Sequence, residues 1–191
     1  ILGGAMAQVL KDEIRQCILD SALEEFFIHG YVRTTIRDIA GRAGIPAGLI
    51  YSYYKNKEAL FDEVLRPVCF DWKRVMKHGG SPDYQDYKYL SQMEENCIRT
   101  LFRHRRELII MMDKSTKTKY EDEKERLVSE IEHHLNSHKD MLKNHDPVFV
   151  HIVANNFVDA LLQIAYHYES EEWAMELLNK ISKMYLQGIG F

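Results

Sequence analysis

The chain has 191 residues, which fits one medium-sized domain or a small module joined to a larger one. Its composition is 46% hydrophobic and 28% charged with only 4 prolines, so a core can form and a disordered or low-complexity chain is excluded. The formal net charge of −4 argues against binding polyanions through bulk charge. Its three widely spaced cysteines predict neither a disulfide framework nor a cysteine metal site, and they favour a reducing compartment.

The sequence contains no long uncharged segment. Its two charge-free stretches in the apolar C-terminal part, 147–158 and 160–168, are shorter than the roughly 18 residues needed to span a bilayer. The first residues, Ile-Leu-Gly-Gly-Ala, lack the parts of a secretory signal, and we interpret them as a remnant before Met6. We therefore expect a cytoplasmic protein without a membrane segment.

The residues that follow predict short helices separated by glycines. Apolar residues at helical spacing predict a helix over about 11–29, and Gly30 stands where a left-handed C-terminal cap belongs. Thr35 is expected to cap a second helix of about two turns, with Asp38 near its positive end. Gly44 is expected to end that second helix.

A third short helix is expected to begin at Ile45 and Pro46, because proline is tolerated in a first helical turn. Residues 58–66 predict a fourth helix that leads into the larger part of the chain. The second and third helices are joined by a tight, glycine-containing turn. This is the helix-turn-helix arrangement that fits a helix into the major groove of DNA.

Several unlike motifs then agree in order with one known family. They are Leu19–Ala22, Phe26–Phe27, Gly30–Tyr31, Thr34–Ala40, Ala43–Ile45, Gly48, Tyr51 and Lys55–Leu60. On these motifs the stretch 18–65 resembles the DNA-binding domain of TetR-family transcriptional regulators. The resemblance implies an all-α homodimer, in which a three-helix helix-turn-helix domain reads a palindromic operator in double-stranded DNA. It also implies a larger helical bundle that dimerises and usually binds a small-molecule effector.

The resemblance assigns contacts to individual residues. Ala47 and Gly48 would lie closest to the base edges, and Arg37 could reach a base or a phosphate from the preceding helix. The residues placed at the DNA backbone are Thr35, Tyr51, Ser52, Tyr53 and Lys57. Hydroxyl groups and an ammonium can donate to phosphate oxygens, while the guanidinium of Arg37 matches guanine O6 and N7.

The third helix departs from the family's pattern because it is poor in polar residues. Pro46 stands where the family frequently has serine or threonine, and Ala47 where it frequently has lysine or another polar residue. Leu49 stands where threonine is common, and Tyr53 where histidine is common. Residues 6–66 contain eight Lys or Arg against nine Asp or Glu. Operator binding is therefore expected to be specific, salt-sensitive and dependent on dimer avidity.

Other interpretations of the chain remain open on the residues alone. In an ordinary helical protein, Tyr51, Tyr53 and Tyr54 would simply pack, and a helical adaptor would dimerise without touching DNA. An enzyme or metal-binding protein is a further class. The chain lacks the G-x-S-x-G, P-loop and H-E-x-x-H motifs. We expect a repressor without enzymatic activity or cofactor, which a small molecule releases from its operator.

The rest of the chain predicts long helices in a bundle, since residues 82–186 contain no glycine and their apolar residues recur every three or four positions. A charged helix is expected over 121–142. Glu130, His134 and His138 share one of its faces and could hold a metal. A solvated histidine-rich face is the preferred interpretation, so no metal site is expected.

The helix expected over 148–166 is apolar nearly all round, so it must be buried on two sides. Together with a helix over 171–186, it predicts a dimer interface through residues about 148–187, with a purely internal core as the alternative. Candidate effector-pocket residues, although residues of these types more often belong to a core, are Trp72, Met93, Phe102, Met111, Met112, Tyr120 and Phe157. The predicted domains are 6–66 for DNA binding and 67–191 for effector binding and dimerisation.

Overall fold

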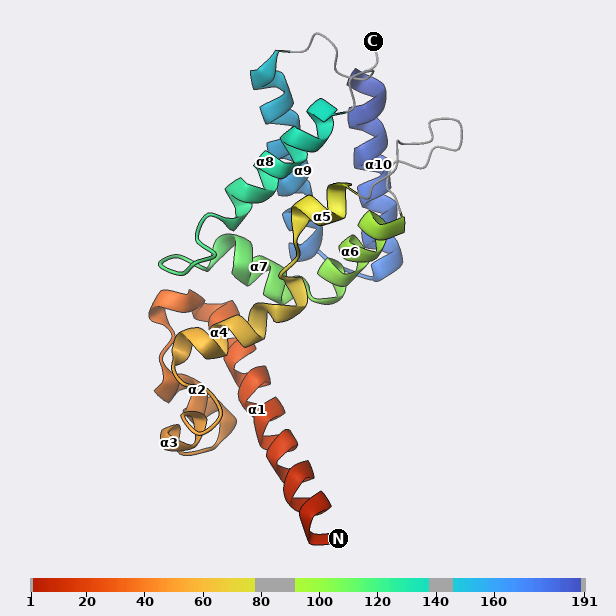
Figure 1. The fold of residues 1–191 in the computed structure, drawn as a ribbon. Helices are drawn as coiled ribbons and strands as arrows, with labels where there is room; N and C mark the ends of the chain where they lie inside the picture. The colour runs from red at the N-terminus through yellow and green to blue at the C-terminus, as the bar shows by residue number, and fades with distance from the viewer. Residues whose placement is uncertain (1, 78–91, 138–145, 190–191) are drawn as a thin grey trace. The chain divides into compact units, whose positions relative to one another are not determined.

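The computed structural model describes residues 2–77, 92–137 and 146–189 (Figure 1). Within these ranges the chain forms α-helices, one short 3-10 helix and no strand, which confirms the all-α prediction. It divides into two compact units. The first comprises residues 1–67 and 110–121, and the second comprises 68–109 and 122–191.

Four helices belong to the first unit. They are α1 (Leu2–Arg33), α2 (Ile36–Ala43), α3 (Ala47–Ile50) and α4 (Lys57–Leu65), and a 3-10 helix (Arg66–Val68) follows. Both α2 and α4 pack on α1, while α3 packs on α2. Their fully buried side chains are Ile18, Ala22, Phe26, Ile39, Ile50, Leu60, Phe61 and Leu65. Because the members of this core on α1 recur every four residues, one face of α1 packs against α2 and α4.

Two boundaries differ in detail from the sequence prediction. Helix α1 begins at Leu2, and its helical geometry is broken at Gly30, where φ is 72° and ψ is 169°. The positive φ is as expected for glycine, but the extended ψ differs from a left-handed helical cap. Helix α3 begins at Ala47, because Pro46 has extended backbone with ψ of 137° and occupies the N-cap position.

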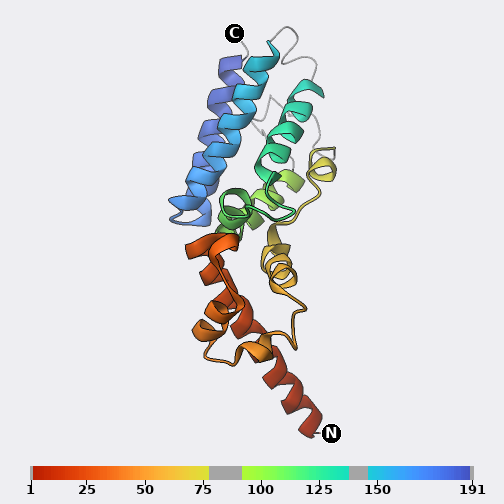
Figure 2. The same cartoon turned by 90° about the vertical axis from the view of Figure 1, so that its left-hand side faces the viewer.

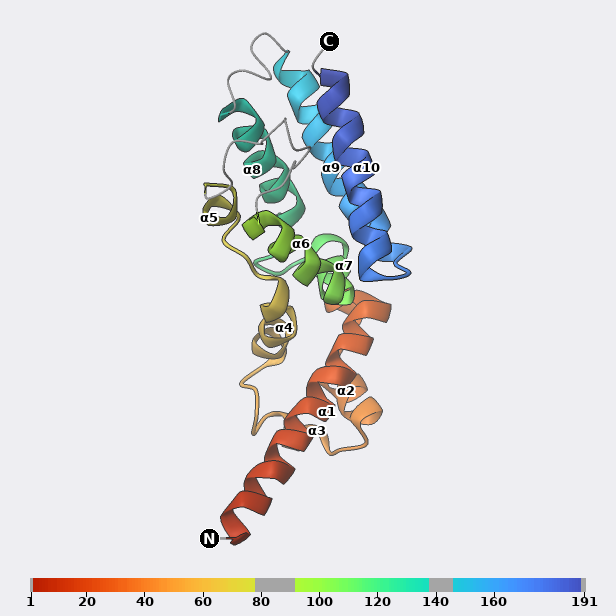
Figure 3. The ribbon, with the colours of Figure 1, turned by 90° about the vertical axis from the view of Figure 1, so that its right-hand side faces the viewer.

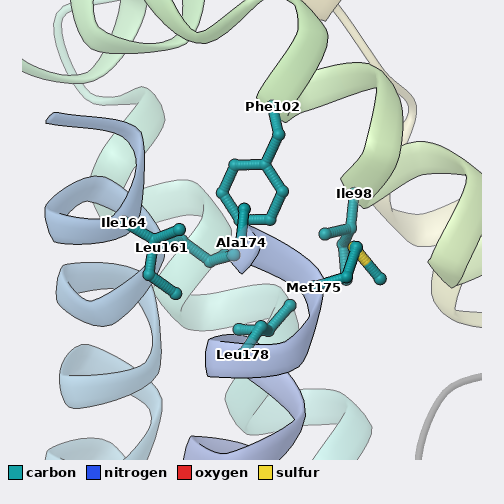
Figure 4. Close-up of a cluster of buried hydrophobic side chains, with 7 residues drawn as sticks. All are labelled: Ile98, Phe102, Leu161, Ile164, Ala174, Met175 and Leu178. Atoms are coloured by element: carbon teal, nitrogen blue, oxygen red, sulfur yellow. The ribbon is translucent and has the colours of Figure 1, made fainter. Parts of the chain in front are cut away.

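The second unit is a larger bundle (Figures 2 and 3). Its helices are α5 (Trp72–Lys77), α6 (Gln92–Arg103), α8 (Glu123–Ser137), α9 (Pro147–Tyr166) and α10 (Glu171–Ile189); α7 (Arg105–Asp113) begins in this unit and ends in the first. Helix α9 packs on α8 and α10, and α10 also packs on α6. A buried apolar cluster joins α6, α9 and α10 (Figure 4).

An ion-pair network adds a polar link between α6 and α10. The carboxylate of Glu171 accepts hydrogen bonds from Arg103 Nε at 2.6 Å and from Arg99 Nη1 at 2.9 Å. These bonds hold the pKa of Glu171 below its usual value. The two arginines therefore fix the first turn of α10 to the second half of α6.

Helix α9 has apolar residues on opposite sides. Its buried residues are Val150, Val153, Ala154, Val158, Leu161, Leu162, Ile164 and Ala165, whereas Val148, Phe149, Ile152 and Tyr166 are exposed. By length and composition this helix could cross a membrane, a test that the core helix of a soluble protein also passes. Packing within the second unit thus buries one side of α9, while these four apolar residues keep a large exposed surface.

Candidate nucleic-acid interface

Helix α2 is closed at both ends by local interactions. At its start, the Thr35 hydroxyl oxygen accepts from the Asp38 backbone N–H at 3.2 Å, while Asp38 Oδ2 accepts from the Thr35 backbone N–H at 2.9 Å. This capping box satisfies two backbone donors. Hydrogen bonds from Thr35 also lower the pKa of Asp38. Gly44 ends the helix, as the sequence predicts, and it does so with left-handed backbone at a φ of 66°.

The two arginines of α2 have different environments. Arg42 Nε donates to Glu25 Oε1 at 2.6 Å, and Glu25 is a buried residue of α1. Arg37 is exposed and has no hydrogen-bond or ion-pair partner among the described residues. The guanidinium of Arg42 thus holds α2 to α1, while that of Arg37 is available to a ligand.

Helix α3 is anchored through one side and open on the other. Ile50 is completely buried, and Tyr54 is only 8% exposed, as expected of two apolar residues four positions apart on one helical face. Gly48 is exposed, and a Cβ built there would meet nothing within 4 Å. Ala47 is half-buried, and Tyr51 is 57% exposed. The surface around Gly48 and Tyr51 is therefore open to solvent.

The turn after α3 carries two further predicted contacts. Ser52 is exposed, and its hydroxyl donates to the Leu49 carbonyl at 2.6 Å. Tyr53 is half-buried. The hydroxyl oxygen of Ser52 can still accept, but its proton is engaged within the turn.

Lys57, the first residue of α4, is held within the first unit. Its ammonium donates to the Tyr31 carbonyl at 2.7 Å and to the Thr34 carbonyl at 2.9 Å. The same Nζ lies 4.1 Å from the centroid of the Tyr31 ring. Burial lowers the pKa of Lys57. Sequence reasoning places this side chain at a phosphate, whereas in the structure it contacts the end of α1 and the start of α2.

The segment 110–121 packs on the same unit, which the sequence analysis did not anticipate. The backbone N–H of Tyr31 donates to the Lys114 carbonyl at 3.0 Å, and Lys119 pairs with Asp62 at 2.6 Å. The Tyr120 ring lies 6.1 Å from that of Phe61. Three predicted effector-pocket residues, Met111, Met112 and Tyr120, belong to this segment.

The remaining effector-pocket candidates belong to the second unit. Phe102 is fully buried in the cluster of Figure 4, and Phe157 packs against that cluster. Trp72 is buried and its indole N–H donates to Glu123 at 3.3 Å, while Met93 is half-buried on α6. Of the predicted set, the structure therefore brings Phe102 and Phe157 to one cluster.

The residues considered as metal ligands, Glu130 and His134, each lie close to a different charged side chain. Glu130 lies 3.7 Å from the ammonium of Lys73, and His134 lies 3.8 Å from Glu94. His138 falls outside the described residues. Within the described ranges, no group of three histidine, cysteine or acidic residues is arranged to hold a metal ion.

The helix-turn-helix region matches a known family. Residues 18–64 match the model of the family described as "Bacterial regulatory proteins, tetR family". The chain is 32% identical over 88 residues to an HTH-type transcriptional regulator, YhgD, of Bacillus subtilis, covering 46% of this chain and 42% of the relative. It is 40% identical over 58 residues to the probable acrEF/envCD operon repressor of Escherichia coli K12, covering 30% of this chain and 26% of the relative.

The fold is similar over a longer range than the sequence. The MbdR regulator from Azoarcus sp. CIB aligns with a TM-score of 0.63 at 19% identity, over 92% of this chain and 98% of that one. The segments that align in sequence cover less than half the length of each of the two sequence relatives. The sequence likeness is thus concentrated around the helix-turn-helix, while the helical fold is shared throughout.

Proposed function

Since the chain belongs to the TetR family of bacterial regulatory proteins, we propose that it is a homodimeric repressor. It binds a palindromic operator in double-stranded DNA and leaves that operator when a small molecule binds. The predicted division into a DNA-binding domain over 6–66 and an effector and dimerisation domain over 67–191 is part of this proposal. We further propose that the protein acts in the cytoplasm, without enzymatic activity.

The observation that carries the proposal is the one-sided anchoring of α3. Ile50 is buried while Gly48 and Tyr51 face solvent, so the helix presents a fixed outward surface. A backbone without a side chain at Gly48 allows close approach to a DNA groove. Arg37 supplies an unpaired guanidinium on the preceding helix, which suits guanine O6 and N7.

The remaining contacts follow from the same surface. Ala47 offers a methyl group to a thymine methyl, and the hydroxyls of Tyr51 and Tyr53 donate to phosphate oxygens. Thr35 and Ser52 contribute oxygens beside the DNA backbone, although both hydroxyls also make internal hydrogen bonds.

Dimerisation and effector binding are assigned to the second unit. The exposed apolar residues of α9, which are Val148, Phe149 and Ile152 near its start and Tyr166 at its end, support an interface with a second copy through residues about 148–187, because exposed apolar residues that lie together mark association sites. The effector site is proposed around Phe102 and Phe157, where a cluster of apolar side chains suits an apolar or aromatic ligand. Effector binding would shift the dimer to a state in which the two α3 helices no longer fit successive major grooves.

The test is selection of bound sequences from a random pool of duplex DNA by the full chain, repeated with a panel of small molecules. We expect an inverted repeat to be enriched, with half-sites one helical turn apart or a multiple of it. At least one compound should release the selected duplex. Failure to enrich any sequence, or enrichment of a motif without two-fold symmetry, would reject the homodimeric regulator.

A further inference from the structure

We propose that Lys57 is a positioning residue for the helix-turn-helix rather than a ligand of the DNA backbone, and that Lys55 makes the phosphate contact at this place. The inference rests on the proposed operator binding. The two lysines are two residues apart and carry the same charge, but their surroundings differ. Lys57 is half-buried and bonded internally, whereas Lys55 is exposed and has no hydrogen-bond or ion-pair partner among the described residues.

The donors of Lys57 are largely engaged. An ammonium has three N–H groups, and two of them reach the carbonyls of Tyr31 at 2.7 Å and Thr34 at 2.9 Å. The tyrosine ring lies 4.1 Å from the same nitrogen, where a cation is attracted to the ring face. Turning this ammonium outward to a phosphate would give up both bonds and the ring contact.

The carbonyls that Lys57 binds lie where α1 ends and α2 begins. Thr34 is buried, its hydroxyl donates to the Gly30 carbonyl at 2.8 Å, and it directly precedes the N-cap Thr35. The Tyr31 ring packs against Phe61 of α4, with centroids 4.8 Å apart. Lys57 therefore ties the first turn of α4 to the residues that set the direction of α2, the helix that carries Arg37.

Lys55 lies in the connection between α3 and α4, one residue before Asn56, the N-cap of α4. Its ammonium can turn to a phosphate without losing an internal bond. The positive end of the α4 dipole lies next to it and favours an anion at the same place. Lys57 thus positions the helices, and Lys55 takes the phosphate contact that the family resemblance assigns to Lys57.

The test compares Lys57→Met with Lys55→Met in the full chain, on a duplex recovered by the selection. Each change removes one positive charge per chain, so effects of net charge are matched. We expect Lys55→Met to reduce the slope of log Kd against log salt by about 1.8 per dimer, from two lost phosphate contacts. We expect Lys57→Met to leave the slope unchanged, while weakening binding by about tenfold at a temperature where the variant is fully folded.

Thermal unfolding and a conservative variant separate positioning from packing. Lys57→Met should lower Tm by about 2 to 4 °C, whereas Lys55→Met should not change it. Lys57→Arg should restore operator affinity, because a guanidinium can also donate to two carbonyls. The inference would be overturned if Lys57→Met reduced the slope of log Kd against log salt. It would also be overturned if this change left both operator affinity and Tm unaltered.

A measurement on the unaltered chain needs neither folded variants nor an operator. The ammonium of Lys57 should give a proton–nitrogen NMR signal in the free protein, because bonded and half-buried N–H groups exchange slowly with water. The exposed ammonium of Lys55 should give no such signal. The reverse pattern would contradict the inference. If the selection enriches no duplex, the proposed function fails, while this signal and the Tm values still decide whether Lys57 is engaged internally.

Discussion

The neighbouring helices α2 and α3 are fixed by different means. Helix α2 has a capping box at Thr35, a left-handed glycine cap at Gly44 and an ion pair from Arg42 to the buried Glu25. Helix α3 spans four residues, its N-cap Pro46 makes no side-chain hydrogen bond, and its one completely buried side chain is Ile50. Helix α2 is thus held by its caps, an ion pair and the buried Ile36, Ile39 and Ala40, whereas α3 depends on the burial of Ile50.

The difference explains how a surface poor in polar residues can serve recognition. Because Ile50 anchors α3, the outward residues of this helix are not needed to hold it in place and can contact a partner. In α2 most polar side chains already have internal partners, and Arg37 is the exception. Substitutions that separate anchoring from recognition can test this contrast.

The largest effect is expected where α3 is anchored. Ile50→Ala should lower the free energy of unfolding by about 2 to 5 kcal/mol, because it leaves a cavity in a fully buried site. The half-buried Leu49 on the same helix is the matched control and should lose less when changed to alanine. Urea denaturation followed by circular dichroism measures both. Equal losses at the two positions would show that α3 is not anchored through Ile50.

The next effect concerns recognition rather than stability. Arg37→Ala should weaken operator binding by about 1 to 3 kcal/mol for each base pair read, and leave Tm unchanged, because the side chain is exposed and unpaired. Arg42→Ala removes the same charge from the same helix but should lower Tm, since it leaves buried Glu25 without this partner. Titration of the selected duplex and thermal unfolding give the two readouts. A fall in Tm for Arg37→Ala would count against its assignment as a DNA contact.

A smaller effect is expected at the start of α2. Thr35→Ala should destabilise the protein by roughly 0.5 to 2 kcal/mol, because it removes the capping oxygen. Ser52→Ala is the control, since its exposed hydroxyl donates to the Leu49 carbonyl at the end of α3 and accepts from no backbone N–H at the start of a helix. Urea denaturation of both variants should show the greater loss for Thr35→Ala. The same loss for both would mean that the capping box adds nothing.

The smallest effect is a pH dependence of the same cap. Hydrogen bonds from Thr35 hold the pKa of Asp38 below its ordinary value of 3.8 in the folded chain. The stabilisation is therefore fully present above that ordinary value, and it is lost as the pH falls through the lowered pKa of the folded state. The Tm difference between the unaltered chain and Asp38→Ala should shrink in this acidic range. A difference independent of pH would exclude the carboxylate as its source.

The features that the sequence predicted correctly, the caps of α2 and the core-facing side of α3, depend on residues only a few positions apart. Thr35, Asp38 and Gly44 act within a few residues of themselves, so their roles are readable from spacing. Ile50 and Tyr54 follow from the helical repeat. The bond from Lys57 to Tyr31 spans 26 positions, and no local pattern contains it. For the same reason, apolar character at Met111 and Met112 could not reveal that these residues belong to the first compact unit rather than the second.

The exposed apolar residues at the start of α9 have a consequence for behaviour in dilute solution. If a second copy covers Val148, Phe149 and Ile152, association stabilises the folded chain by mass action. Its melting temperature should then rise with protein concentration. At low protein concentration, part of the population would then be monomeric, and the abundance of the protein would itself set how much of it is dimeric and able to occupy a two-fold site.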